Sequence, residues 1–247
     1  MSLAGHVALV TGAGRNIGRA IALELAARGA AVVVNARRNA AEAERVAEEA
    51  RRLGVRALAI LADVGRPDDV RRLAEHALGE FPVVDIVVNN AAIRPEQPFL
   101  ELSEAEWHAV LDVDLHAAFY TAKAFVPGMA ERRWGRIINL TGMNALLGGV
   151  GRPHVSAAKH GLWGLTKALA RELGPKGITV NAISPGPIET DHADPAARQH
   201  AQAQLGRIPL GRLGQPEDIA RLCAYLASDD GGFVSGQMVA VNGAATT

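Results

Sequence analysis

Short apolar runs, rich in β-branched residues, alternate along the chain with longer stretches in which apolar residues recur at helical spacing. Runs of this kind are typical of strands buried in a parallel sheet. We expect seven such strands, at residues 6–11, 31–35, 57–61, 85–89, 136–140, 178–182 and 237–241. The helical spacing predicts helices over residues 17–28, 40–53, 67–79, 103–132 and 155–173.

This alternation predicts an α/β protein. Repeated strand–helix–strand units place parallel strands in one sheet and helices on both of its faces. No Pro/Ser-rich linker and no internal repeat divides the 247 residues, so we expect one domain over residues 1–247. The least regular stretch, residues 185–209, is expected to form a lid over a binding site.

Composition narrows the possible partners. Hydrophobic residues make up 49% of the chain, and the 26 basic residues balance the 26 acidic ones. A balanced charge gives no electrostatic reason to expect nucleic acid or a membrane surface as a partner. The single cysteine, Cys223, cannot form an internal disulfide. The first residues lack the pattern of a signal peptide. No apolar run approaches the ~20 residues that span a bilayer. We expect a soluble cytoplasmic protein without a metal site.

The first predicted strand runs into a glycine-rich turn, TGAGRNIG at residues 11–18, and a helix is expected directly afterwards. Such a turn brings the backbone close to a pyrophosphate, which the unpaired N–H groups of the helix N-terminus can bind. The glycine pattern alone also occurs in structural turns, but the order strand, turn, helix is the one that a dinucleotide site requires. We therefore predict a doubly wound Rossmann fold with about seven parallel strands. Candidate cofactor-binding residues in the turn are Gly12, Arg15, Asn16, Ile17 and Gly18.

Five motifs, in order, resemble the short-chain dehydrogenase/reductase family over essentially the whole chain. They are the turn at 11–18, the pair at 63–64, NNAA at 89–92, SPGPIET at 184–190 and GRLGQPEDI at 211–219. The resemblance implies that the cofactor is also contacted by Asp63, Val64, Asn90, Ala91, Pro185, Gly186, Ile188 and Thr190. Asn16 stands where the family has its middle glycine. Because asparagine tolerates left-handed backbone, we expect the turn to survive this change.

The end of the second predicted strand bears on the choice between NAD and NADP. Relatives that use NAD carry an acidic residue there, whereas this chain has Ala36 followed by Arg37. Arg37 and Arg15 could clamp the 2′-phosphate of NADP, a task that suits the planar guanidinium. The alternative is that both arginines are solvated loop residues. We predict NADP(H) as the cofactor.

The catalytic positions depart from the family pattern. In the family, a tyrosine four residues before a lysine exchanges a proton with the substrate oxygen, a serine polarises the carbonyl, and an asparagine holds a water relay. This chain keeps the lysine, Lys159, but has Val155, Gly142 and Asp114 at the other three positions. General acid catalysis contributes roughly 10²–10⁴ in rate. The usual mechanism of carbonyl reduction therefore does not transfer to this chain.

Four residues remain as candidates for the chemistry. Lys159 and Asp114 could orient a proton-donating water, a pairing similar to that in peroxisomal-type 2,4-dienoyl-CoA reductases, whose hydride goes to a conjugated C=C bond. Lys159 could equally bind the nicotinamide ribose alone, with Asp114 as its buried counter-charge. Asn144 could line the pocket or only shape its loop. His154 is expected at the surface or the substrate rim rather than as a catalytic acid, because adjacent helical residues point about 100° apart.

These patterns leave three hypotheses. The first is an NADP(H)-dependent oxidoreductase with a rebuilt proton relay, acting on a small carbonyl or conjugated enone; the others are an inactive NADP(H)-binding subunit and a non-redox enzyme with a structural cofactor. We favour the first, because the chain retains its cofactor-binding residues together with Lys159. The resemblance also implies a homodimer or homotetramer through residues 103–132 and 155–173, or a hetero-oligomer with an active relative. The pocket rim is expected to include Arg94, Met143, Leu146, Arg152 and His192.

Overall fold

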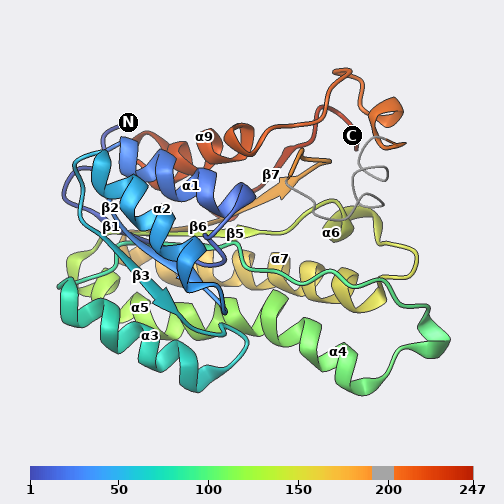
Figure 1. Cartoon of the computed structure of the whole chain (residues 1–247), viewed down its shortest axis with the longest axis horizontal. Helices are drawn as coiled ribbons and strands as arrows, with labels where there is room; N and C mark the ends of the chain where they lie inside the picture. Colours follow the sequence, from blue (N-terminus) through green and yellow to red (C-terminus); the bar gives the residue numbers. More distant parts are fainter. Residues whose placement is uncertain (191–202, 247) are drawn as a thin grey trace.

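The structure is a computed structural model that describes residues 1–190 and 203–246, except for the side chain of Asn144. Its middle layer is a parallel sheet of seven strands in the order β3-β2-β1-β4-β5-β6-β7 (Figure 1). The strands are β1 (Val7–Val10), β2 (Ala31–Ala36), β3 (Ala57–Leu61), β4 (Ile86–Asn89), β5 (Gly135–Leu140), β6 (Ile178–Pro185) and β7 (Met238–Val241). The strand order reverses between β1 and β4, and ligands of such sheets bind at the carboxyl ends of the strands near this point. The predicted doubly wound fold is confirmed.

Helices cover both faces of the sheet (Figure 1). One face carries α1 (Asn16–Ala27), α2 (Ala40–Arg52) and α9 (Pro216–Ala227), and the other carries α3 (Pro67–Glu80), α4 (Glu104–Leu111), α5 (Ala117–Arg132) and α7 (Pro153–Leu173). Successive side chains of β1 enter opposite cores, because strand residues alternate between faces: Ala8 packs toward α1, whereas Leu9 packs toward α5. Short helices complete the chain, namely η1 (Phe99–Glu101), α6 (Asn144–Leu147), η3 (Gly174–Lys176), η4 (Leu205–Arg207) and η5 (Asp229–Gly231).

The helix predicted over residues 103–132 is not continuous. A capping box formed by Ser103 and Glu106 starts α4, and a π-helical turn, η2 (Asp112–His116), separates α4 from α5. No glycine or proline marks this turn, so the periodicity of the sequence does not reveal it. Such turns are rare and often occur at functional sites. Two other helices, α6 and α9, were absent from the predicted helical segments.

A buried chain of side-chain hydrogen bonds ties α5 and α7 to the sheet. The hydroxyl of Thr121 in α5 donates to Asn89 Oδ1 at 2.8 Å, and Asn89 Nδ2 donates to Asn139 Oδ1 at 2.8 Å. Asn139 Nδ2 then donates to the Thr166 hydroxyl of α7 at 2.9 Å. These bonds hold α5 and α7 in register with the ends of β4 and β5.

Two observations concern the expectations from composition. No helix in residues 1–190 or 203–246 is long and apolar enough to cross a bilayer. Cys223 lies in α9, fully buried against the core, and burial raises the pKa of its thiol. Because the thiolate is the reactive form, Cys223 is a packing residue rather than a nucleophile.

Candidate functional site

The turn after β1 adopts the conformation that its glycines and its asparagine predict. Gly12 and Asn16 have φ angles of 63° and 50°, both in the left-handed region. Glycine adopts this region freely and asparagine tolerates it, so the expectation for Asn16 is confirmed. A Cβ atom on Gly18 would lie 2.3 Å from the Gly12 carbonyl oxygen. Only glycine therefore fits at position 18, where α1 passes the turn.

Side chains from two neighbouring strands hold this turn in place. Thr11 Oγ1 accepts hydrogen bonds from the backbone N–H groups of Asn90 and Ala91, each at 3.0 Å. In return, Asn90 Nδ2 donates to the carbonyls of Thr11 and Gly12 at 2.8 and 3.1 Å. The Asn90 amide thus supports the turn through the protein itself. Its role as a direct cofactor contact stays a prediction.

Asn35 is a site residue that sequence reasoning missed. It lies at the end of β2, is almost completely buried, and its Oδ1 accepts from the Gly12 N–H at 3.4 Å. Its Nδ2 donates to the carbonyls of Ile60 and Ala62 at 3.2 and 3.1 Å, and its own carbonyl accepts from Ala13 N–H at 2.8 Å. The available signal was a single polar residue that ends an apolar run. Asn35 joins the ends of three strands beneath the turn.

The N-terminus of α1 is open to a ligand. Its N-cap residue, Arg15, makes no side-chain capping bond, and the first turn of α1 holds no acidic residue. The exposed side chains of Arg15 and Arg37 make no ion pair or hydrogen bond with the described residues. Uncapped N–H groups at the positive end of a helix favour an anion. This edge of the sheet therefore fits a ligand that carries several phosphate groups.

Asp63 and Val64 lie just beyond the end of β3. Asp63 Oδ1 accepts from the Gly65 N–H at 3.1 Å, and the Asp63 N–H donates to Asp69 Oδ2 at 3.2 Å. Val64 is buried and packs with Val70. The pair is thus placed at the carboxyl edge, as expected, but the Val64 side chain belongs to the core. Contact between these residues and an adenine ring stays a prediction.

The segment that begins at Pro185 is anchored to the C-terminal part of the chain. The Gly186 N–H donates to the Val241 carbonyl at 2.9 Å, and a Cβ on Gly186 would lie 2.6 Å from Asn242 Cα. Glycine is therefore required here for a close backbone approach. The expected lid at 185–209 begins with a tightly packed segment.

Further along, Ile188 pairs with Gly214 in an isolated parallel bridge. Ile188 is almost fully buried, and Thr190 is partly buried. Residues 191–202, including His192, lie outside the described residues. The lid itself stays a prediction.

Lys159 and Asp114 form the expected polar pair. Lys159 Nζ lies 3.1 Å from Asp114 Oδ2, and both side chains are buried. Nζ also donates to the Leu140 carbonyl at 3.0 Å, and Asp114 Oδ1 accepts from the Ile93 N–H at 2.8 Å. The approach to Oδ2 has a poor angle for a hydrogen bond, so the attraction is mainly between the charges. The π-helical turn η2 directs Asp114 inward to this position.

The environment of Lys159 disfavours its charge. Burial lowers the pKa of Lys159, the Asp114 carboxylate opposes this effect, and the positive charge of Arg94 adds to the lowering. Desolvation penalises a buried ammonium, and a nearby carboxylate restores part of the loss. Desolvation thus disfavours the charged form of the buried Lys159 side chain, and the Asp114 carboxylate favours it.

Gly142 and Val155 occupy the two positions at which the family resemblance predicts hydroxyl donors. Val155 is 1% exposed and packs in an apolar cluster whose other members are Val110, Ala158, Ile93, Leu111 and Leu115. Gly142 has a φ of 120°, and a Cβ placed there would meet nothing within 4 Å. Space is therefore available at position 142, but side chains rarely adopt this backbone conformation. Neither position offers a proton donor.

His154 does not lie at the surface or the substrate rim, so this expectation was wrong. Its side chain is completely buried, and neither ring nitrogen has a hydrogen-bond partner among the described residues. The reason is tertiary: α7 begins at Pro153, and its first turn packs under α4. Val155, the next residue of α7, packs with Val110 of α4.

Asn144 is the first residue of α6, which follows β5. The structure describes its backbone and not its side chain. Its two expected roles, lining the pocket or shaping the loop, therefore both stay predictions. Met143 precedes it as the N-cap residue of α6.

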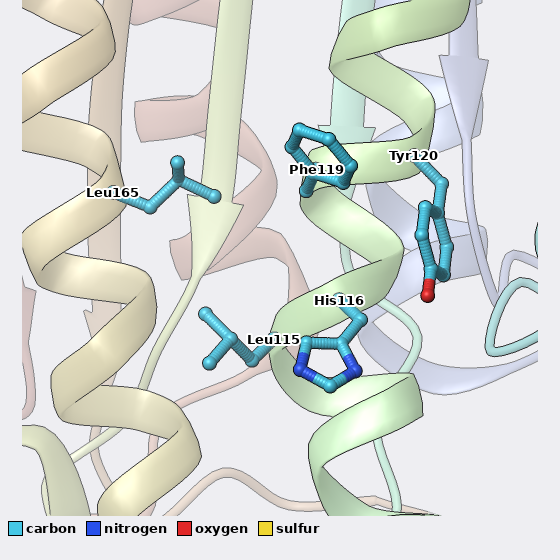
Figure 2. A pocket seen from close by; sticks show the side chains of 5 residues that line it. All are labelled: Leu115, His116, Phe119, Tyr120 and Leu165. Carbon is cyan, nitrogen blue, oxygen red and sulfur yellow. The ribbon is translucent and has the colours of Figure 1, made fainter.

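A separate groove of about 350 Å³ lies between α5 and α7. Figure 2 shows Leu115 and Leu165 pointing toward each other across it; Leu115 and His116 belong to η2, and Phe119 and Tyr120 belong to α5. None of the predicted catalytic or cofactor-binding residues lines this groove. Its apolar character and its half-exposed Phe119 distinguish this groove from the polar region around the turn after β1 and the N-terminus of α1.

Known proteins resemble the chain over its whole length. The model of a family described as Enoyl-(Acyl carrier protein) reductase matches residues 12–246. A 3-oxoacyl-[acyl-carrier-protein] reductase FabG from Pseudomonas aeruginosa is 44% identical over 243 residues, which cover 98% of each chain. The protein of the same name from Staphylococcus epidermidis is 42% identical over 236 residues, 96% of this chain and 97% of the relative. A solved structure from Sinorhizobium meliloti, assigned provisionally as a short-chain alcohol dehydrogenase, has a TM-score of 0.93 at 33% identity and covers 98% of this chain.

Proposed function

The chain belongs to the short-chain dehydrogenase/reductase family of oxidoreductases, and on that premise we propose that it uses NADP(H) to reduce a carbonyl or a conjugated enone through a non-standard catalytic centre. One observation carries the proposal. The buried pair of Lys159 and Asp114 is intact at 3.1 Å, whereas Val155 is enclosed in an apolar cluster. The site thus keeps its charges and lacks the hydroxyl that usually delivers the proton.

The choice of NADP(H) rests on the edge formed by the ends of β1 and β2. Ala36 is buried and offers no carboxylate to a ribose diol. Arg37 beside it is exposed and has no ion pair or hydrogen bond with the part of the chain that the structure describes. With Arg15, it provides two guanidinium groups for a 2′-phosphate. The open N-terminus of α1 suits the pyrophosphate. The bound cofactor would supply a hydride, and Lys159 would hold its nicotinamide ribose.

The proton must then come from a group other than a side chain at position 155. The Lys159–Asp114 pair could orient a water molecule for this purpose, since each member retains bonding capacity beyond the contacts described. The substrate would be a small molecule, and the 3-oxoacyl group in the relatives' names is one carbonyl to test. Hydride addition to a conjugated C=C bond is the other, because it leaves the carbonyl to be activated at a distance.

The experiment is a screen of NADPH oxidation with an activated ketone, a 3-oxoacyl thioester and a conjugated enone. We expect little turnover of the simple ketone, because no hydroxyl donor faces it. Val155→Tyr, alone and with Asp114→Asn, should raise ketone reduction and weaken the native reaction. Gly142→Ser completes the family pattern, but the φ of 120° at that position will limit its gain. Efficient ketone reduction by the unmodified protein would contradict the proposal.

A second candidate is an NADP(H)-binding subunit without catalysis. The apolar enclosure of Val155 is also what a chain that lost its chemistry would show. Tight NADPH binding without oxidation of NADPH by any substrate of the screen would favour this function. A binding subunit would lose only cofactor affinity in Lys159→Ala, whereas an enzyme would lose turnover as well.

We further propose that the protein assembles as a homodimer or homotetramer in the cytoplasm, with the groove between α5 and α7 (Figure 2) in the interface. Half-exposed Phe119 would lose contact with water there, which favours association. Sedimentation of the native protein and of Phe119→Glu tests this assignment. Dissociation of the variant is expected, and a native monomer would contradict it.

A further inference from the structure

We propose that Arg94 receives the oxygen of the substrate as that oxygen becomes negatively charged, in place of the hydroxyl donors that positions 142 and 155 lack. This inference rests on the proposed function of the same site. It assigns the substrate as a compound whose carbonyl oxygen turns into an alkoxide or an enolate during hydride addition.

Arg94 lies in the loop that leaves the carboxyl end of β4, and that loop is fastened to the catalytic pair. The residue before it, Ile93, donates its backbone N–H to Asp114 Oδ1 at 2.8 Å. Ile93 also packs in the apolar cluster of Val155. The backbone that carries Arg94 is therefore held directly beside Asp114 and Val155.

The guanidinium of Arg94 has no partner of its own. Its side chain is exposed and makes no ion pair or hydrogen bond with the described residues. Arg152, the N-cap residue of α7, by contrast forms an ion pair with Glu96, with Arg152 Nη2 at 3.3 Å from Glu96 Oε2. Arg94 can thus bind an incoming oxygen without first giving up a bond within the protein.

Electrostatic coupling places Arg94 near both members of the buried pair. Desolvation by its surroundings lowers the pKa of Arg94, Asp114 raises it, and Arg152 lowers it; Arg94 in turn lowers the pKa of Lys159. Even when lowered, the pKa of an arginine lies so far above neutral pH that the guanidinium stays charged. The positive charge of Arg94 thus lies within electrostatic reach of the buried pair.

A guanidinium can stabilise an oxyanion but does not readily give up a proton. A nicotinamide cofactor, when bound, would supply a hydride to the substrate carbon, and the π electrons of the substrate would then move onto the carbonyl oxygen. Arg94 donates hydrogen bonds to this oxygen. A water molecule then protonates the anion and releases hydroxide to the solvent. Because this proton arrives late, a conjugated enone, whose enolate spreads the charge, should react better than a simple ketone.

The test uses 4-nitrophenol as a mimic of the enolate, because its visible absorbance reports whether it is bound as the phenol or the phenolate. The full-length protein is titrated with and without saturating NADP⁺. We expect preferential binding of the phenolate, with an apparent pKa of the bound probe below that of the free probe. In Arg94→Gln the phenolate affinity should fall roughly tenfold or more, and Arg94→Lys should retain part of it.

Arg45→Gln is the matched control, since Arg45 is exposed on α2 and its side chain makes no ion pair or hydrogen bond with the described residues. It removes the same charge and should leave the affinity unchanged. An equal loss in both variants, an unchanged affinity in Arg94→Gln, or no phenolate binding by the native protein would overturn the inference.

The same variants separate this inference from the proposed function. NADPH-dependent enone reduction with an unchanged kcat in Arg94→Gln would retain the function and overturn the role of Arg94. Arg94-dependent phenolate binding without oxidation of NADPH by any substrate would retain the oxyanion site and overturn the oxidoreductase proposal.

Discussion

The turn after β1 and the region around Lys159 lie at the same edge of the sheet, but different forces hold them. In the turn, backbone conformation decides: Gly12 is left-handed, and Gly18 has no room for a Cβ. Around Lys159, the structure is held by a buried ion pair with Asp114 and by an apolar cluster that contains Val155. The steric demands in the turn admit only glycine at position 18. The packing around Lys159 admits any set of side chains that fills the space and balances the charge.

This difference is consistent with the proposal that the chain keeps a cofactor site while its catalytic residues differ from those of the family. A substitution in the turn disturbs the path of the backbone itself. A substitution such as valine at position 155 instead removes a hydroxyl and leaves a well-packed helix contact. The scaffold therefore constrains cofactor binding more strongly than it constrains the chemistry that follows.

The largest effect is expected at Gly18. In Gly18→Ala the new Cβ would lie 2.3 Å from the Gly12 carbonyl oxygen and 2.5 Å from Asn90 Nδ2, so the turn must open. We expect a loss of about 3 kcal/mol in the free energy of unfolding, with no measurable NADPH binding. Urea unfolding and nicotinamide fluorescence measure both. Gly79→Ala in α3 is the control, because its Cβ meets nothing within 4 Å; a similar loss there would contradict the steric explanation.

The second effect concerns the buried charges. Asp114→Leu leaves the Lys159 ammonium buried without its carboxylate and should lower the free energy of unfolding by about 3 kcal/mol. The double variant Asp114→Leu/Lys159→Met removes both charges and should be more stable than Asp114→Leu. Denaturant unfolding of the native protein, both single variants and the double variant gives the coupling energy. If the losses in free energy of unfolding of the two single variants simply add up in the double variant, Lys159 and Asp114 do not stabilise each other.

The third effect concerns cofactor affinity at the proposed 2′-phosphate site. Arg37→Ala removes one of the two guanidinium groups proposed for the 2′-phosphate, and we expect NADPH affinity to fall about tenfold. NADH affinity should change little, because NADH has no phosphate at this position. Fluorescence titration with both cofactors measures the preference. Arg38→Ala, the exposed neighbour, serves as the control, and an equal loss in it would remove Arg37 from the phosphate site.

The smallest effect is a dependence on pH. Burial lowers the pKa of Lys159 in the folded protein, whereas in the unfolded chain it is about 10.4. Between these two values the unfolded chain binds more protons, so the stability contribution of Lys159 should rise with pH through this window. Each unit of pKa difference corresponds to about 1.4 kcal/mol. The difference in free energy of unfolding between the native protein and Lys159→Met, followed from neutral to alkaline pH, should grow; a flat difference would contradict the lowered pKa.

Sequence reasoning recovered the strands and the turn because both depend on residues close together in the chain. It identified Lys159 and Asp114 as a pair through a family resemblance, and the structure brings them within 3.1 Å. It misplaced His154, which is fully buried under α4, and it overlooked Asn35 beneath the turn. Both errors concern side chains whose surroundings come from distant parts of the chain.

By itself, the sequence determined the alternating α/β order, the parallel sheet, the glycine turn with its left-handed Asn16, and the absence of hydroxyl donors at positions 142 and 155. These properties follow from residue type and short-range spacing. Only the tertiary structure decided that the helix over 103–132 breaks at η2 and that Val155 is enclosed. It also decided that Arg94, which has no ion pair or hydrogen bond among residues 1–190 and 203–246, lies close enough to the buried charges to affect them. The physical reason is that burial and electrostatic coupling depend on which helices pack together, and local periodicity carries no information about that choice.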